Sequence, residues 1–73
     1  MFYNLNTNIR FLRKKNGFTI PHLAKMLGVG KSTVDNIECG KNNTSIEVLD
    51  KLHTIFNISL DDLVYKDLSS SEE

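Results

Sequence analysis

The stretch that decides the fold is Thr19–Gly40, with the sequence T-I-P-H-L-A-K-M-L-G-V-G-K-S-T-V-D-N-I-E-C-G. Its apolar residues recur at helical spacing, so each of two short helices gains one apolar face. These residues are Leu23, Ala24 and Leu27 in the first helix, and Val34 and Ile37 in the second. Between them, Gly28 can take the left-handed conformation that ends a helix, and Gly30 can cap the next one. Two helices joined by such a tight turn have the layout of a helix-turn-helix.

Three further helices are predicted, one before this stretch and two after it. The first runs from about Asn6 or Thr7 to Lys15, with Thr7 as its N-cap and an apolar stripe that holds Leu5, Ile9 and Leu12. The fourth helix begins at Thr44-Ser45-Ile46-Glu47, which has the form of a capping box, and continues to Phe56. A fifth begins at Ser59-Leu60-Asp61-Asp62.

The chain is therefore expected to be a single all-α domain of five helices. With 73 residues it has little room for a second core. We expect the domain to occupy residues 1–66 and residues 67–73 to be a solvated, flexible acidic tail.

The charge of the chain is zero overall but is divided along the sequence. Residues 1–41 carry seven Lys and Arg against two Asp and Glu, and residues 42–73 carry two against seven. The basic half contains the helix-turn-helix, where contacts with phosphate groups would be needed. Uneven charge also arises by chance in small domains, but its coincidence with the motif favours a nucleic-acid partner.

Several other classes of protein find no support in the sequence. One cysteine, Cys39, allows no internal disulfide; it is expected to be a semi-buried, inert thiol in a reduced, cytoplasmic setting. His22 and His53 lie far apart, and no metal, cofactor or small-molecule ligand is expected. The N-terminus does not read as a signal peptide, and no stretch is long and apolar enough to cross a membrane.

A phosphate-binding loop is also a poor interpretation of Gly28–Thr33, although this segment reads G-V-G-K-S-T. That motif needs a first glycine where the chain has Lys25, and it needs a strand where the chain has an amphipathic helix. No nucleophile, base and orienting group form a set elsewhere, so the protein is not expected to be an enzyme.

The chain resembles the Cro/C1-type, or Xre, helix-turn-helix family over roughly residues 5–65. The resemblance rests on a set of matching positions that spans both motif helices, and on the later run S-I-E-V-L-D-K-L-H-T-I-F-N-I-S-L-D-D-L. The matching positions are Arg13, Thr19, Leu23, Ala24, Gly28, Val29, Val34, Ile37, Glu38 and Gly40. It implies a lambda-repressor-like fold and double-stranded DNA as partner, with the second motif helix in the major groove.

The resemblance also implies which residues contact DNA. Base contacts would come from Lys31, Ser32, Thr33 and Asn36; Lys31 suits guanine and Asn36 suits adenine. Phosphate contacts would come from Thr19, the backbone N–H of Ile20, Lys25, Lys41, Asn42 and Asn43. The chain departs from the family at three of its positions, with Ile20 where Gln is common, Gly30 where Ser or Thr is preferred and Thr44 where Pro is usual.

The same resemblance also implies an ion pair within the chain and a homodimer. Arg13 and Glu38 match a pair that joins the first helix to the end of the third. A homodimer is expected on a pseudo-palindromic operator, since family members gain specificity in this way. Candidate interface residues are Phe56, Leu60, Leu63, Val64, Tyr65 and Leu68, with Phe2 and Tyr3 as a second set; closure of the domain's own core competes for Leu60 and Leu63.

These expectations amount to a small transcriptional regulator that acts as a repressor, since occlusion of a promoter needs no separate effector domain. The alternative is a protein-interaction module, an antitoxin-like or adaptor domain that uses the same fold with weak or no DNA binding. Ile20 and the zero net charge favour that alternative slightly.

Overall fold

The computed structural model describes residues 4–41 and 44–68 of the chain. Within these ranges it consists of helices and connecting segments and contains no strand, as the sequence predicts. The helices are α1 (Leu5–Lys15), α2 (Ile20–Leu27), α3 (Lys31–Cys39), α4 (Ile46–Phe56) and α5 (Leu60–Tyr65). None of them is long and apolar enough to span a membrane.

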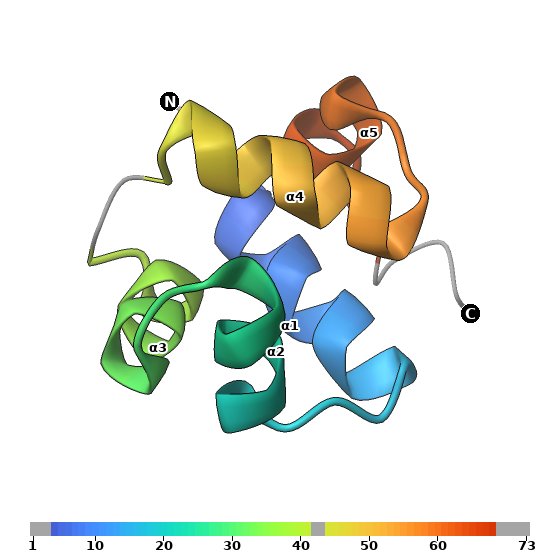
Figure 1. Cartoon of the computed structure of the whole chain (residues 1–73). Coiled ribbons are helices and arrows are strands. Elements are labelled where there is room, and N and C mark those ends of the chain that lie inside the picture. Colours follow the sequence, from blue (N-terminus) through green and yellow to red (C-terminus); the bar gives the residue numbers. More distant parts are fainter. Residues whose placement is uncertain (1–3, 42–43, 69–73) are drawn as a thin grey trace.

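The helices enclose one apolar core, with α1 at its centre (Figure 1). α1 packs against α3 and α5, while α4 crosses above α2 and leads back into α5. Leu23 of α2, Leu52 of α4 and Leu63 of α5 are fully buried and belong to this one core cluster. Burial of this kind is the main favourable term in folding. The core thus fastens the α2–α3 motif to the rest of the domain.

The ends of α2 and α3 are formed by the residues that the sequence predicts. The Thr19 hydroxyl accepts a hydrogen bond from the His22 N–H at 3.1 Å and caps α2. Gly28 and Gly40, with φ of 74° and 80°, end α2 and α3 in the left-handed conformation. The positive φ at position 40 is the reason for glycine there; a Cβ atom would also lie 2.7 Å from Asn6 Nδ2, so the Asn6 side chain would have to shift.

The starts of α1 and α4 differ from the predicted ones. α1 has Asn4, not Thr7, at its N-cap position, because Leu5 is buried and the helix must include it to face the core. α4 is capped by Ser45, whose Oγ accepts the Val48 N–H at 3.3 Å. The predicted capping box placed the cap one residue earlier, at Thr44. Thr44 is buried and lies outside the helix, directly before Ser45.

The tail and the cysteine were also predicted wrongly in part. Leu68, assigned to the solvated tail, is buried in the core cluster, while Asp67 is exposed and residues 69–73 lie outside the described residues. Leu68 packs because it is apolar and because its N–H bonds to Asn8 Oδ1 at 3.1 Å. Cys39 is exposed, not semi-buried, because it lies on the outer side of the last turn of α3.

The α1–α5 junction, formed by Asn8 against residues 63–68, is absent from the sequence-based predictions. Asn8 is fully buried, and its Nδ2 donates to the carbonyls of Leu63 at 2.7 Å and Lys66 at 2.6 Å. Together with the bond from Leu68, one amide side chain satisfies three backbone groups at the end of α5. Asn8 lies on the same face as Leu5 and Leu12, and a polar residue within that stripe was the available signal.

Asn4 extends the same junction by one turn. Its backbone N–H bonds to the Val64 carbonyl at 3.1 Å and its Nδ2 to the Tyr65 carbonyl at 2.8 Å. The last carbonyls of a helix have no partner within that helix. At the end of α5, two asparagines at the start of α1 therefore supply those partners.

Candidate nucleic-acid interface

The outer face of α3 carries the residues expected to reach base edges. Lys31 and Ser32 are exposed in its first turn, and Asn36 lies one turn further along the side of Ser32 and is half-buried. Thr33 is half-buried between this side and the core. Val34 and Ile37 are buried on the opposite face, which fixes the outward direction of the polar residues.

The start of α3 is favourable for an approaching phosphate backbone. Its N-cap is Gly30, and its first turn contains no acidic residue but does contain Lys31. The unpaired N–H groups at a helix start carry partial positive charge. Asp35, which is exposed on the same helix, is the one group on its outer side that opposes this charge.

The residues expected to contact phosphate divide between exposed and inward positions. Thr19, Lys25 and Lys41 are exposed, but the Thr19 hydroxyl oxygen already accepts the capping bond. Ile20 is half-buried and packs against the core, so what it offers at the start of α2 is its backbone N–H. Asn42 and Asn43 lie outside the described residues.

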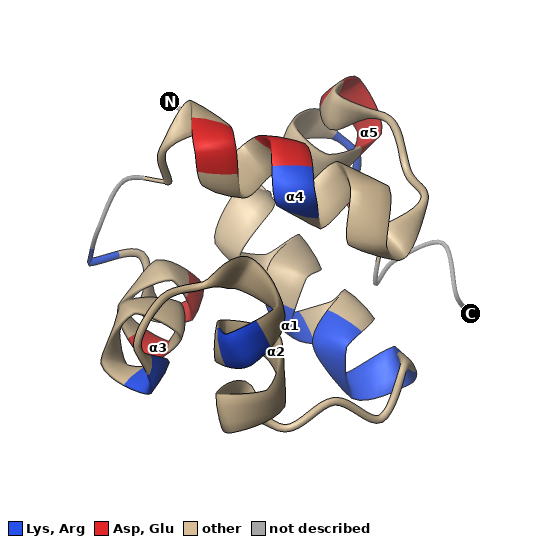
Figure 2. Ribbon diagram, in the orientation of Figure 1, with Lys and Arg blue, Asp and Glu red and all other residues tan. Residues whose placement is uncertain are grey.

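Charge is separated in space as well as in sequence. Figure 2 shows basic residues on α1, on α2 and at the start of α3, and acidic residues mainly on α4 and α5. α3 also carries the acidic residues Asp35 and Glu38, and α4 also carries Lys51. α2 and the end of α1 thus form the basic side of the molecule, and Lys31 at the start of α3 adds to it. Basic residues grouped in this way can attract a polyanion to α2 and the start of α3.

The Arg13–Glu38 pair joins α1 to the end of α3. Arg13 Nε and Nη2 donate to the two carboxylate oxygens of Glu38 at 2.7 and 3.2 Å, and Nη1 donates to the Phe18 carbonyl at 3.0 Å. The two side chains are only 10% and 5% exposed. A paired fork of this kind fixes both distance and orientation. The pair therefore holds α3, α1 and the segment before α2 in one arrangement.

Most residues proposed for a dimer interface belong instead to the core. Leu63, Val64 and Leu68 are buried, and Phe56 is half-buried with its ring 6.1 Å from that of Phe18. Leu63 and Val64 face inward because α5 packs against α1 and closes the core there. Leu60 and Tyr65 remain accessible, at 38% and 58% exposed, so Leu60 is not taken up by the core. Phe2 and Tyr3 lie outside the described residues.

Ile46 is a further exposed apolar residue that the sequence-based interface omitted. It is 73% exposed at the start of α4. Its place in the apolar pattern of α4 suggested a core position, but the first residue of a helix can project beyond the neighbouring elements. Ile46 thus joins Leu60 and Tyr65 as apolar surface available to a partner.

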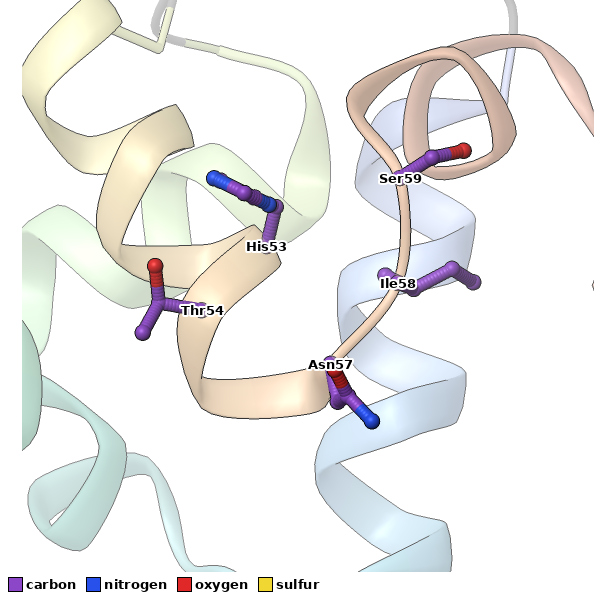
Figure 3. Close-up of a pocket in the computed structure, with 5 residues that line it drawn as sticks. All are labelled: His53, Thr54, Asn57, Ile58 and Ser59. Atoms are coloured by element: carbon purple, nitrogen blue, oxygen red, sulfur yellow. The ribbon is translucent and has the colours of Figure 1, made fainter.

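A shallow depression lies where α4 leads into α5. It has a volume of about 360 Å³ and is lined by His53, Thr54, Asn57, Ile58 and Ser59. Figure 3 shows these side chains pointing in different directions and not toward a common centre. In the parts of the chain that the structure describes, no group of three or more His, Cys, Asp or Glu could hold a metal ion. The outer face of α3 therefore remains the candidate site.

Comparison with known proteins identifies the family. Residues 9–63 match the family model described as helix-turn-helix, of the Cro/C1 type. The chain belongs to the Cro/C1-type helix-turn-helix family. At the level of class, it is a DNA-binding transcriptional regulator.

Individual relatives agree with this assignment. An uncharacterized HTH-type transcriptional regulator from Archaeoglobus fulgidus is 39% identical over 59 residues, covering 81% of this chain and 84% of that protein. The competence pilus inhibition repressor of Acinetobacter baylyi is 38% identical over 52 residues, covering 71% of this chain and 47% of the repressor. The crystal structure of the restriction-modification controller protein C.AhdI from Aeromonas hydrophila matches with a TM-score of 0.74 and 30% identity, covering 82% and 91% of the two chains.

Proposed function

We propose that this Cro/C1-type protein binds a pseudo-palindromic operator as a homodimer and represses transcription by occlusion. The observation that carries the proposal is the polar outer face of α3, held on a core and clamped at its far end by the Arg13–Glu38 pair. An α-helix with its side chains is about 10–12 Å in diameter, which fits a major groove about 12 Å wide. At nine residues, α3 is roughly 13 Å long, enough to present its outer face to a few base pairs. The protein would act in the cytoplasm through binding alone, without a catalytic step.

Each side chain on this face has a defined role in the proposal. Lys31 donates to guanine O6 or N7, and Asn36 forms a bidentate pair with adenine. Ser32 and Thr33 contact neighbouring bases, with the Thr33 methyl suited to a thymine methyl. The start of α2, Lys25 and Lys41 contact phosphates on both sides of the groove, with Asn42 and Asn43 next in the chain.

The homodimer follows from the small size of the base-reading surface. One nine-residue helix reads only a few base pairs, and a second copy on a two-fold axis doubles that number. Leu60 and Tyr65 supply accessible apolar surface on α5, and Ile46 supplies it on α4. Sedimentation velocity at micromolar concentration should show a dimer that dissociates in Leu60→Asp/Tyr65→Asp. A monomer at every concentration, with and without DNA, contradicts the dimer.

The DNA-binding part is tested by selecting duplexes from a random pool and titrating the selected duplex by fluorescence anisotropy. We expect affinity to fall steeply with salt, because each phosphate contact releases counterions. The slope of log affinity against log salt then counts those contacts. If no selected or random duplex binds in a salt-dependent way, the proposal is wrong.

A protein-interaction module remains the second candidate, and two observations favour it. Ile20 turns its side chain toward the core where the family commonly has Gln, and Asp35 places a negative charge on the outer side of α3. Both weaken attraction for DNA without affecting the fold. In that case salt-dependent duplex binding would be absent, while α3 would still form a rigid polar face for another protein.

A further inference from the structure

The turn between α2 and α3 receives a hydrogen bond from a helix outside the motif. The carbonyls of Ala24 and Lys25 are paired within the turn, with the N–H groups of Val29 at 3.0 Å and Gly28 at 3.2 Å. The carbonyl of Leu27, the last residue of α2, instead accepts a hydrogen bond from Lys51 Nζ of α4 at 3.1 Å. A side chain of α4 thus completes the end of α2.

The α3 side of the turn has no comparable side-chain hydrogen bond. α3 has Gly30 at its N-cap and no side-chain capping bond, so its first turn is joined to Gly30 through the backbone N–H groups of Thr33 and Val34. A serine or threonine at position 30 would have added a side-chain hydrogen bond at this point. Lys51 therefore adds a side-chain hydrogen bond on the α2 side of a turn whose α3 side has no side-chain capping bond.

Charge and packing reinforce this hydrogen bond. The carbonyl end of a helix carries partial negative charge, and the Lys51 ammonium lies against it. A Cβ atom at Gly28 would lie 3.5 Å from Lys51 Nζ, so the ammonium group also lies directly over the glycine that ends α2. Lys51 is an exposed residue, but its ammonium group forms a partly buried, charge-assisted hydrogen bond to the turn.

We propose that Lys51 is a positioning residue for DNA recognition. By binding the Leu27 carbonyl it fixes the turn that sets the angle of α3, and so a helix on the acidic side of the molecule contributes to base reading without contacting DNA. The inference rests on the proposed function, because it assumes that α3 enters the major groove.

The experiment compares Lys51→Met, Lys51→Arg and the control Lys66→Met, an exposed lysine in the acidic half. Each is titrated with the selected duplex over a series of salt concentrations, at a temperature where circular dichroism shows it folded. We expect Lys51→Met to bind the duplex roughly three- to tenfold more weakly. This lies within the range found for substitutions that change a binding site without contacting the ligand. The salt slope should stay unchanged, Lys51→Arg should recover most of the affinity, and Lys66→Met should match the wild type.

The salt slope separates positioning from direct contact. If Lys51 bound a phosphate, its loss would make the slope shallower by about 0.9, and the positioning role would be wrong. Unchanged affinity in Lys51→Met would also overturn it. If the wild type itself fails to bind any duplex, the proposed function fails and the role of Lys51 in recognition fails with it.

A second measurement on the free protein does not depend on DNA. In Lys51→Met, amide hydrogen exchange should accelerate at Val29 more than in the core of α1, since the turn loses its external bond. Lys51→Arg should restore the slow exchange. Equal acceleration throughout the molecule would indicate a general loss of stability and would contradict a local effect on the turn.

Discussion

The two ends of α1 fasten the domain in different ways. Near its start, the neutral amide of Asn8 pairs with three backbone groups at the end of α5. Near its end, the guanidinium of Arg13 pairs with the Glu38 carboxylate on α3 and with the Phe18 carbonyl. The first junction closes the core; the second joins the core to the helix proposed to read DNA. Asn8 therefore serves mainly to keep the protein folded, whereas Arg13 also orients the proposed binding face.

The largest effect is expected for Asn8→Ala. The change removes this partner from the buried Leu63 carbonyl, the buried Leu68 N–H and the partly buried Lys66 carbonyl. At about 1 kcal/mol or more for each group, we expect a loss of about 3 kcal/mol in the free energy of unfolding. Urea unfolding followed by circular dichroism measures it. The control, Thr7→Ala on the exposed side of the same helix, should stay within about 0.5 kcal/mol of wild type.

A smaller loss of stability, with a larger loss of binding, is expected for Glu38→Ala. Arg13 would remain nearly buried without its counter-charge, so we expect about 2 kcal/mol of destabilisation. DNA affinity, measured where the variant is folded, should fall in addition, since α3 loses the bond that orients it. Wild-type melting together with wild-type affinity would show that the pair has neither role.

The double variant Arg13→Met/Glu38→Leu tests the second junction more sharply. Replacing a buried ion pair by apolar side chains is often neutral or stabilising, so most of the melting temperature should return. DNA affinity should stay below wild type because apolar contacts do not fix orientation as a paired fork does. Full recovery of affinity would show that α3 needs packing here but no defined hydrogen bonds.

An effect confined to recognition is expected for Asn36→Ala, which leaves both junctions intact. The variant should lose roughly 1–3 kcal/mol of discrimination at one base pair of the selected duplex. The comparison variant Asp35→Ala removes a negative charge from the same helix and should strengthen binding to all duplexes alike. A uniform loss across all sequences in Asn36→Ala would place Asn36 on phosphate and not on a base.

The smallest effect is expected for Ile20→Gln, and it is a gain. A glutamine at the start of α2 can add one neutral hydrogen bond to phosphate, which corresponds to about threefold tighter binding. The salt slope should not change, since no charge is added. Weaker binding in a folded variant would show that the half-buried Ile20 side chain helps to hold α2 in place.

Local features of the fold could be predicted from the sequence. Thr19, Gly28, Gly40 and Ser59 act within three or four residues of their own positions, so turn and capping rules identify them. The same rules misplace the starts of α1 and α4, because burial of Leu5 and Thr44 decides those ends. Local patterns predict that a helix exists better than they predict where it begins.

Contacts between distant segments could not be predicted. Asn8 bonds to backbone groups 55 to 60 residues away, and Lys51 bonds to one 24 residues away. Because every residue has a backbone carbonyl, the sequence does not indicate which one a distant side chain will bind. The Arg13–Glu38 pair came from resemblance, because both partners are side chains with recognisable identities. The base-contacting role of α3 stays a prediction, since its residues have DNA, and not another part of the chain, as their expected partner.

The α1–α5 junction also closes a longer loop of chain than the Arg13–Glu38 pair does. Asn8 meets Leu63 across 55 residues, whereas Arg13 meets Glu38 across 25. Closing the longer loop costs about 0.7 kcal/mol more in chain entropy. The bonds of Asn8 therefore depend on a more distant part of the chain than the bond that orients the binding face.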